Sequence, residues 1–417
     1  MMYDDIAGNP ANPRPGQLIN HPTGQDNYVG MPKDYTADAV TAENFLAVLS
    51  GNSSAIRASR NANGRVVEAG PTDRIFVFYS DHGAPGILGM PSGDFLYADK
   101  LHKVIKHRAK SREFGEMVLY IEACESGSIF EGLLEDDLNV YATTAANGQE
   151  SSWGTYCPGM DPGAPMEFMT CLGDLYSVSW MEDADQNDLT HETLKKQYQR
   201  VKQRTSQNFT YNQGSHVQRF GELELDEEEA SRFLGDENTG PVQPTVVWNA
   251  AAHVGGVDAT YNVPQREADL LPLKLAAAKE LAGDYSGMPL ASPGLTARDQ
   301  LRFEIERRTA LDASVLETVI ILSKSTGLLS ALDPLAIMER PVPAPKGRAL
   351  VSDWDCLRAM VSEWTTACGP LDQYGMKHSR AFANLCNLGV DPQLFASAAS
   401  LACSGGKEAI MTPTASF

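Results

Sequence analysis

Two short apolar runs constrain this chain most, because each leads directly to a side chain capable of covalent chemistry. The run 74–80 (RIFVFYS) precedes Asp81 and His82, and the run 117–123 (MVLYIEA) precedes Cys124. Runs of this length, rich in β-branched and aromatic residues, are typical of buried strands. In an open α/β sheet the ligand crevice lies at the carboxyl ends of the strands. We therefore predict that His82 and Cys124 meet at one edge of a parallel sheet, as a thiolate nucleophile and its base must.

The first half of the chain supplies the other elements of an α/β domain. Helical spacing is predicted over 41–49, with Thr41 as N-cap, over 98–109 and over 190–205. A third strand is predicted over 138–143, and a fourth short apolar run covers 174–180. Alternating strands and helices imply right-handed crossovers and a parallel sheet. We therefore predict an α/β domain over 1–237.

The second half has a different pattern. Residues 238–295 follow an acidic stretch, are rich in Gly, Pro, Ala and Asn, and are predicted to be a linker. From residue 296 onward the spacing is helical, apart from a Pro-rich break over 340–346. We therefore predict an all-α domain over 296–417.

Composition argues against several functions. The formal net charge is −20, so the phosphates of nucleic acids would be repelled. No apolar run has the length of a membrane span, and no signal-peptide pattern is visible at the N-terminus. The sequence has no CxxC pair, so we expect no zinc site, and no cofactor is expected. Asn52-Ser-Ser and Asn208-Phe-Thr are N-glycosylation sequons.

The cysteines indicate a cellular compartment. Four lie near the C-terminus, two flank a Pro- and Gly-rich loop, and one stands alone after a strand. In order they are Cys356, Cys368, Cys386 and Cys403, then Cys157 and Cys171, then Cys124. Three pairs plus one free thiol are typical of a thiol enzyme made in the secretory pathway. A cytosolic protein with reduced cysteines is the alternative.

The surroundings of the two reactive residues indicate further roles. Period-2 alternation places Glu122 on the same strand face as Cys124. Because an unpaired buried carboxylate is costly, we predict that Glu122 binds a substrate group. Gly83 permits close backbone approach, and its N–H could form an oxyanion hole with the N–H of Cys124.

Several long strings carry a family resemblance. They are MMYDDIAGNPANPRPGQLINHP, MPKDYTADAVTAENFLAVLSGN, FVFYSDHGAPGILGMP, LYIEACESGSIFEGLL, NVYATTAANGQESSWGTYCPG and CLGDLYSVSWMEDAD. They resemble the legumains, which are asparaginyl endopeptidases (vacuolar processing enzymes) and caspase-like cysteine peptidases of vacuoles and lysosomes. The loop between Cys157 and Cys171 looks like the plant-type branch. The strings SDWDCLRAM and QYGMKHSRAFANLCNLGV resemble the family's helical prodomain, which caps the active site until acid-triggered self-cleavage.

The resemblance implies roles position by position. Cys124 matches the nucleophile, His82 its partner, and Asp81 the aspartate that in this family can occur as a succinimide. A pocket that selects Asn must accept hydrogen bonds from the side-chain N–H₂ and donate to its carbonyl. The implied pocket acids and neighbouring wall are Glu122, Asp174, Ser152 and Trp153. The implied disulfides are Cys157–Cys171, Cys356–Cys386 and Cys368–Cys403.

One part of the family pattern is not found. Legumains begin with a strand and a helix that carry an Asn assisting the histidine and an Arg completing the S1 pocket, and this sequence starts after them. The resemblance therefore implies a caspase-like parallel sheet without its first strand. We expect a cysteine endopeptidase zymogen that cleaves after Asn, and after Asp at lower pH, in vacuolar protein processing. The alternative is a truncated, catalytically impaired protein that only binds.

The expected partners follow from this function. They are peptides containing Asn or Asp, and the chain's own prodomain as inhibitor, with no nucleic acid and no membrane. The localisation implied is the vacuole or lysosome, reached through the secretory pathway. Some relatives join peptides, and two positions in the wall of the site decide between joining and hydrolysis. In this sequence the two positions disagree: Gly154 is protease-like, whereas Ala84-Pro85 is ligase-like. We expect hydrolysis to dominate, with some transpeptidation.

The sequence also predicts how the zymogen is activated. The predicted linker holds four possible P1 residues for self-cleavage: Asn249, Asp258, Asn262 and Asp269. Basic residues of the helical cap are expected to pair with the acidic first domain and to release it in acid, when carboxylates become protonated. They are Arg302, Arg307, Arg308, Lys377 and Arg380.

Overall fold

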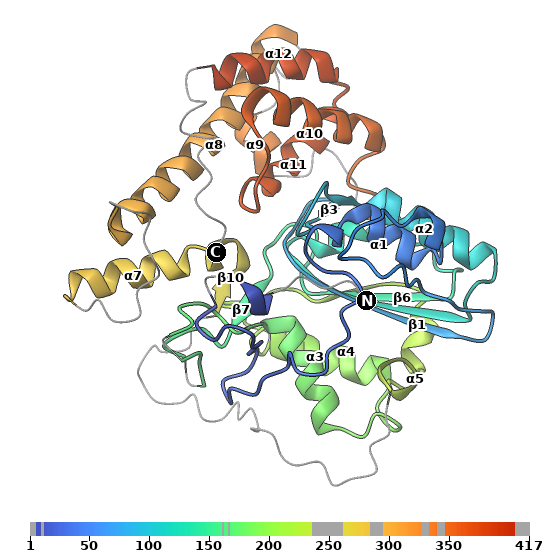
Figure 1. Ribbon diagram of the computed structural model, residues 1–417. Coiled ribbons are helices and arrows are strands. Elements are labelled where there is room, and N and C mark those ends of the chain that lie inside the picture. The colour runs from blue at the N-terminus through green and yellow to red at the C-terminus, as the bar shows by residue number, and fades with distance from the viewer. Residues whose placement is uncertain are drawn as a thin grey trace. The chain divides into compact units, whose positions relative to one another are not determined.

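A computed structural model describes residues 6–9, 12–160, 162–165, 167–235, 262–283, 295–326, 333–339 and 347–404. The chain divides into two compact units (Figure 1). The first contains residues 1–82, 88–130 and 134–268, and the second contains residues 83–87, 131–133 and 269–417. The units are described separately below.

The first unit is built on a four-stranded sheet. Its strands lie in the order β1 (Arg74–Ser80), β5 (Glu116–Glu122), β6 (Val140–Thr144) and β9 (Gln218–Gly221). The pairs β1–β5 and β5–β6 are parallel, and β6–β9 is antiparallel. Every residue of β6, and all but the first of β5, is buried, as expected for central strands covered on both faces. The three predicted strands are thus confirmed, and the sheet is mixed because β9 was not predicted.

Helices cover both faces of this sheet. Figure 1 shows α1 (Ala42–Leu49) and α2 (Ala98–Lys110) on one face and α3 (Leu175–Gln186), α4 (Leu194–Thr205) and α5 (Ser231–Leu234) on the other. Helix α1 begins where predicted, because the Thr41 side chain accepts a hydrogen bond from the Asn44 N–H. Thr193 caps α4 in the same way. The layered arrangement is that of a caspase-like α/β domain.

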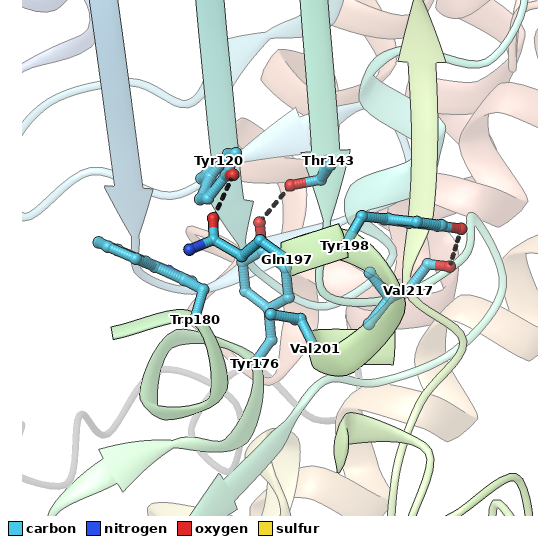
Figure 2. A pocket seen from close by; sticks show the side chains of 8 residues that line it. All are labelled: Tyr120, Thr143, Tyr176, Trp180, Gln197, Tyr198, Val201 and Val217. Atoms are coloured by element: carbon cyan, nitrogen blue, oxygen red, sulfur yellow. Dashed lines mark hydrogen bonds between the residues drawn. The ribbon is translucent and has the colours of Figure 1, made fainter. Parts of the chain in front are cut away.

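The core beneath the sheet is aromatic. Tyr120 lies edge-to-face against Trp180, and Phe76 and Phe78 pack against the same indole. Figure 2 shows a small pocket in this core, between β5, β6, α3 and α4. Its polar groups bind one another, as in the hydrogen bond of 2.6 Å from the Tyr120 hydroxyl to Gln197 Oε1. None of the residues predicted to be catalytic lines this pocket.

Two stretches differ from the interpretation of the sequence. The apolar run 174–180 lies mostly in a helix: only Asp174 belongs to a short strand, β8 (Gly173–Asp174), and helix α3 begins at Leu175. The predicted linker 238–295 contains the short strand β10 (Val263–Pro264) and two helices, α6 (Gln265–Ala268) and α7 (Leu271–Leu281). Packing of these segments against distant parts of the chain outweighed their local composition.

A second, small sheet lies beside the main one in the first unit. Its order is β10, β7 (Trp153–Thr155) and β8, and both pairs are antiparallel. The disulfide Cys157–Cys171 joins the segments that follow β7 and precede β8. The remaining short elements are β2 (Gly83–Ala84), β3 (Ile87–Leu88), β4 (Leu96–Tyr97) and the 3-10 helices Ile6–Gly8, Ala37–Ala39, Ser53–Ala55, Ser126–Ile129 and Leu223–Glu227.

The second unit is helical. It contains α7, α8 (Ala297–Thr326), α9 (Pro334–Glu339), α10 (Trp354–Cys368), η7 (Gly375–His378), α11 (Ser379–Asn387) and α12 (Pro392–Cys403). Trp364, Phe382 and Phe395 pack together in its core. The disulfides Cys356–Cys386 and Cys368–Cys403 tie α10 to α11 and α12, which confirms both predicted pairings. No helix among the described residues has both the length and the hydropathy to cross a bilayer.

Candidate active site

The site begins where β1 and β5 end. Ser80 is in register with Glu122, and the Asp81 N–H donates to the Glu122 carbonyl at 3.3 Å. His82 and Cys124 follow these paired residues at equal distance along the chain. The structure therefore brings the predicted histidine and cysteine to the carboxyl ends of neighbouring parallel strands.

Cys124 is the free thiol of the described cysteines and is buried. Its Sγ lies 3.1 Å from Ser151 Oγ and 3.7 Å from Ser152 Oγ. Burial raises the pKa of the Cys124 thiol, and the neighbouring Glu125 carboxylate raises it further. The Arg266 guanidinium and the two serine hydroxyls act on this pKa in the opposite direction. The resting state is consequently a protonated thiol that needs a base.

His82 is held through its backbone. Its N–H donates to Asp81 Oδ1 at 2.6 Å, and its carbonyl accepts from the Tyr79 hydroxyl at 3.1 Å and the Gly89 N–H at 2.8 Å. Asp81 thus orients the main chain at the histidine. Among the groups that act on the pKa of Asp174, His82 lowers it, in opposition to the effect of burial.

Of the two predicted pocket acids, Glu122 is buried and Asp174 is half-buried, and they have different partners. Glu122 Oε2 accepts from the Ser177 N–H and from the Ser177 hydroxyl, each at 2.9 Å. Burial, together with the nearby Asp174 charge, raises the pKa of Glu122 well above its ordinary value. Asp174 Oδ2 accepts from the Ser80 hydroxyl at 3.2 Å, and burial raises the pKa of Asp174 to about 6.

A segment that the sequence analysis assigned to the linker occupies this site. Strand β10 pairs antiparallel with β7, with Val263 opposite Gly154 and Pro264 opposite Trp153. The next residue, Gln265, places its carboxamide between the pocket residues. Its Nε2 donates to Asp174 Oδ1 at 2.7 Å, and its Oε1 accepts from the Ser152 hydroxyl at 2.9 Å.

The backbone and the following side chain hold the same segment. The Gln265 N–H donates to the Ser152 carbonyl at 2.9 Å, and Arg266 forms an ion pair with the buried Glu125, next to Cys124. No sequence signal marked Gln265, because a glutamine after Val-Pro in a Gly- and Pro-rich stretch carries no pattern of its own.

The loop that carries Ser151 and Ser152 is anchored by Glu150. Its carboxylate accepts from the Asn147 N–H at 3.1 Å and from the His216 N–H at 2.7 Å, and it also contacts His216 Nδ1 at 2.8 Å. The Glu150 carbonyl accepts from the Glu125 N–H at 2.8 Å. These bonds fix the loop relative to the turn after Cys124.

Gly83 follows His82 directly and is buried at the start of β2. It groups with the second unit, and its oxyanion role stays a prediction. The described residues contain no cluster of three His, Cys, Asp or Glu side chains arranged to hold a metal ion.

A buried thiol beside a histidine-bearing strand, with a peptide-like segment paired along its wall, defines the class: a cysteine peptidase of caspase-like fold. Comparison with known proteins agrees. The model of the peptidase C13 family matches residues 1–236, and the model of the legumain prodomain matches residues 299–403. The chain therefore belongs to the peptidase C13 family, the legumains, and is a cysteine-type endopeptidase with a C-terminal prodomain.

Individual relatives are similar along almost the whole chain. The sequence is 45% identical over 416 residues to the vacuolar-processing enzyme beta-isozyme of Arabidopsis thaliana, covering 99% of this chain and 79% of that protein. It is 45% identical over 414 residues to the legumain of Canavalia ensiformis, covering 99% of this chain and 82% of that protein. A vacuolar-processing enzyme of Glycine max is 44% identical over 414 residues, covering 99% of this chain and 79% of that protein.

Proposed function

We propose that this zymogen hydrolyses peptide bonds after Asn, with Cys124 as nucleophile and His82 as its base. Glu122, Asp174, Ser152 and Trp153 form the S1 pocket and its wall. One observation carries the specificity: the Gln265 carboxamide is bound by one acceptor, Asp174, and one donor, Ser152. Asn presents the same carboxamide on a side chain shorter by one methylene.

The chemistry is a two-step acyl transfer. His82 takes the proton of the Cys124 thiol, and the thiolate attacks the carbonyl carbon after Asn. The N–H groups of Gly83 and Cys124 are expected to bind the resulting oxyanion. The tetrahedral intermediate expels the amine, which takes the proton from His82, and leaves a thioester on Cys124. Water, deprotonated by His82, then releases the acid and regenerates the thiol.

Segment 262–268 accounts for the inhibited state. Its strand β10 pairs antiparallel with β7, as a substrate would, yet Gln265 stands where the proposed specificity requires asparagine. In the helical unit, the Ser379 hydroxyl donates to the Pro85 carbonyl at 2.8 Å, close in sequence to His82. The contact of Gln265 occupies the S1 residues, and the contact of Ser379 holds the segment that follows His82.

The test uses the full chain incubated at about pH 5 and then assayed with matched fluorogenic peptides that differ only at P1. We expect cleavage after Asn, weaker cleavage after Asp that increases as the pH falls, and none after Lys or Arg. Cys124→Ala should be inactive on all of them. Preference for a basic P1 would contradict the proposal. An intact protein with an alkylatable Cys124 but no turnover would favour the alternative of a binding protein.

The finer properties of the family extend this proposal. Vacuolar localisation is supported by relatives named vacuolar-processing enzymes. Both sequon asparagines, Asn52 and Asn208, are exposed and so accessible for glycans. Hydrolysis is expected to dominate, since the protease-like Gly154 lies in β7 opposite the bound segment. Transpeptidation is expected as a minor activity. Incubation with a peptide amine acceptor, followed by mass spectrometry, would detect the joined product.

A further inference from the structure

A serine hydroxyl lies directly against the candidate nucleophile. The distance from Cys124 Sγ to Ser151 Oγ is 3.1 Å. The Ser151 hydroxyl itself donates to the Ser152 carbonyl at 2.9 Å, and this carbonyl also accepts from the Gln265 N–H at 2.9 Å. A continuous hydrogen-bond chain therefore runs from the thiol to the backbone of the bound segment.

The position of the Ser151 proton sets which group donates in each of these hydrogen bonds. A serine hydroxyl has one proton to donate and two lone pairs to accept with. When its proton points to the Ser152 carbonyl, the Cys124 S–H is the donor in the contact with Ser151. A thiolate has no proton, so it can keep this contact only if the Ser151 O–H turns toward Sγ.

We propose that Ser151 is a further catalytic residue, which accepts a hydrogen bond from the Cys124 thiol at rest and donates one to the thiolate during reaction. This inference rests on the proposed role of Cys124 as nucleophile. The proton lost by Cys124 goes to His82, and the Ser151 proton stays on its oxygen and changes only its acceptor. No further reactant is required.

The bound segment explains how the exchange is coupled to substrate. When Ser151 turns away, the Ser152 carbonyl loses one donor but keeps the Gln265 N–H. The N–H of a P1 residue paired along β7 would take the same place. Ionisation of Cys124 therefore leaves this buried carbonyl satisfied when a peptide is bound, and deprives it of a donor when the site is empty.

The groups around Ser151 favour its hydroxyl as a hydrogen-bond donor to the Cys124 thiolate. Burial raises the pKa of the Cys124 thiol, and the hydroxyls of Ser151 and Ser152 lower it. Hydrogen bonds to charged groups are about twice as strong as those between neutral groups, so the contact gains strength on ionisation. The Glu150–His216 pair holds the loop at the adjacent residue, so Ser151 needs only to rotate its hydroxyl.

The experiment measures the rate at which iodoacetamide alkylates Cys124 in the full-length protein, from about pH 6 to as high a pH as the fold tolerates, by mass spectrometry of the Cys124 peptide. In Ser151→Ala the midpoint should rise by about one pH unit, so that alkylation below the midpoint slows about tenfold. Ser151→Thr keeps the hydroxyl and should restore the midpoint. Ser179→Ala removes a buried hydroxyl in α3 that donates to the Leu175 carbonyl, and should leave the midpoint unchanged.

Two results would overturn the inference. One is an unchanged midpoint in Ser151→Ala, and the other is an equal shift in Ser179→Ala, which would indicate general loosening. If Ser151→Ala does not fold, Ser151→Gly serves in its place, with the same expected midpoint. Alkylation requires no peptide cleavage, so a protein that shows the shift but lacks peptidase activity would contradict the proposed function and leave the Ser151–Cys124 exchange intact.

Discussion

At the scale of single residues, the chemistry depends on a buried thiol that is protonated at rest. Its proton must reach a base, and His82 is the side chain that the ends of β1 and β5 bring to the same edge of the sheet. His82 is half-buried and is anchored mainly through its backbone, so its ring is free for proton transfer. The fold should therefore tolerate its removal while the reaction does not.

We expect His82→Ala to lower kcat/KM for a P1-Asn peptide by about 10²- to 10⁴-fold, the usual contribution of a general base. The melting temperature should change by no more than a few degrees, because the backbone bonds at His82 remain. Steady-state kinetics and thermal unfolding test the two expectations together. A large loss of stability would show that the ring has a structural role instead.

The two pocket acids should respond differently to isosteric amides. Glu122 has a strongly raised pKa and is expected to be neutral, so Glu122→Gln should cost less than tenfold in kcat/KM. Asp174 accepts the carboxamide N–H, so at pH 7, above its pKa of about 6, Asp174→Asn should cost about 10- to 100-fold, the value of a hydrogen bond to a charged acceptor. Equal losses in both variants, measured with one P1-Asn peptide, would contradict this division of roles.

At the scale of elements, the short segment of β10 and α6 occupies the candidate site. Its hold depends on the bond from Gln265 to Asp174, and burial raises the pKa of Asp174 to about 6. Below that pH the acceptor becomes a neutral carboxyl, and a bond to a neutral acceptor is weaker. The effect on folding has the opposite sign: a carboxyl with a raised pKa favours the folded state most below its unfolded value, and this advantage is lost as the pH rises through about 6. The loosening in acid therefore concerns the bond to Gln265 and not the fold as a whole.

We therefore expect the segment to loosen as the pH falls through about 6. Hydrogen exchange of peptides covering 262–268, measured in the Cys124→Ala background to prevent self-cleavage, should speed up over this range. In Gln265→Ala exchange should already be fast at pH 7, and the uncleaved chain with Cys124 restored should gain activity there. Gln393→Ala, an exposed glutamine on α12, is the matched control. If hydrogen exchange of this segment does not depend on pH in the protein that retains Gln265, the proposed acid trigger is refuted.

The disulfides of the helical unit make a second prediction at this scale. Cys356–Cys386 and Cys368–Cys403 span 30 and 35 residues along the chain. In the chain-entropy estimate each stabilises the fold by about 3–4 kcal/mol. Replacing Cys368 and Cys403 together by Ser should therefore lower the free energy of unfolding by about that amount, as measured by denaturant titration. A change below about 1 kcal/mol would show that helix packing alone holds α10 and α12 together.

At the scale of the whole molecule, the basic residues of the helical unit were expected to pair with the acidic first domain. The structure gives Arg307 partners in its own unit, Glu304 and Asp372, and Arg302 pairs with Asp299 and Glu306 of its own helix. Arg308 pairs with Glu304 and with Asp269 of the same unit. These pairs lie within the helical unit and stabilise it.

The helical unit should remain folded in the acid that activates the enzyme. Burial alone would raise the pKa of Asp312, but hydrogen bonds from His378, Tyr374 and Lys377 outweigh it and lower this pKa to about 2. A carboxyl with a depressed pKa stabilises the fold above its unfolded value, and this contribution is lost only as the pH falls from about 4 to about 2. Asp312→Asn should thus lower the melting temperature equally at pH 7 and 5, with the difference vanishing near pH 2.

The structure also narrows the place of self-cleavage. Asn262 is buried and its Nδ2 donates to the Gln213 carbonyl at 2.9 Å, and Asp269 forms an ion pair with Arg308. The other predicted sites, Asn249 and Asp258, lie outside the described residues. We expect mass spectrometry of the acid-treated protein to find the first cut after Asn249 or Asp258. A first cut after Asn262 would require the β10 segment to leave before cleavage.

The sequence by itself determined the strands that end at His82 and Cys124, the three disulfides and the family, because local apolar patterns and long motifs carry that information. It could not determine β9, the helix over 175–186 or the position of Gln265. These depend on pairing and packing between residues far apart in the chain, which no local pattern encodes. The same holds for Ser151, whose hydroxyl meets Cys124 only because the Glu150 carboxylate holds the loop to His216. The sequence therefore predicted the reactive groups, His82 and Cys124. The groups proposed to inhibit and assist them, Gln265 and Ser151, are brought to the site by tertiary contacts.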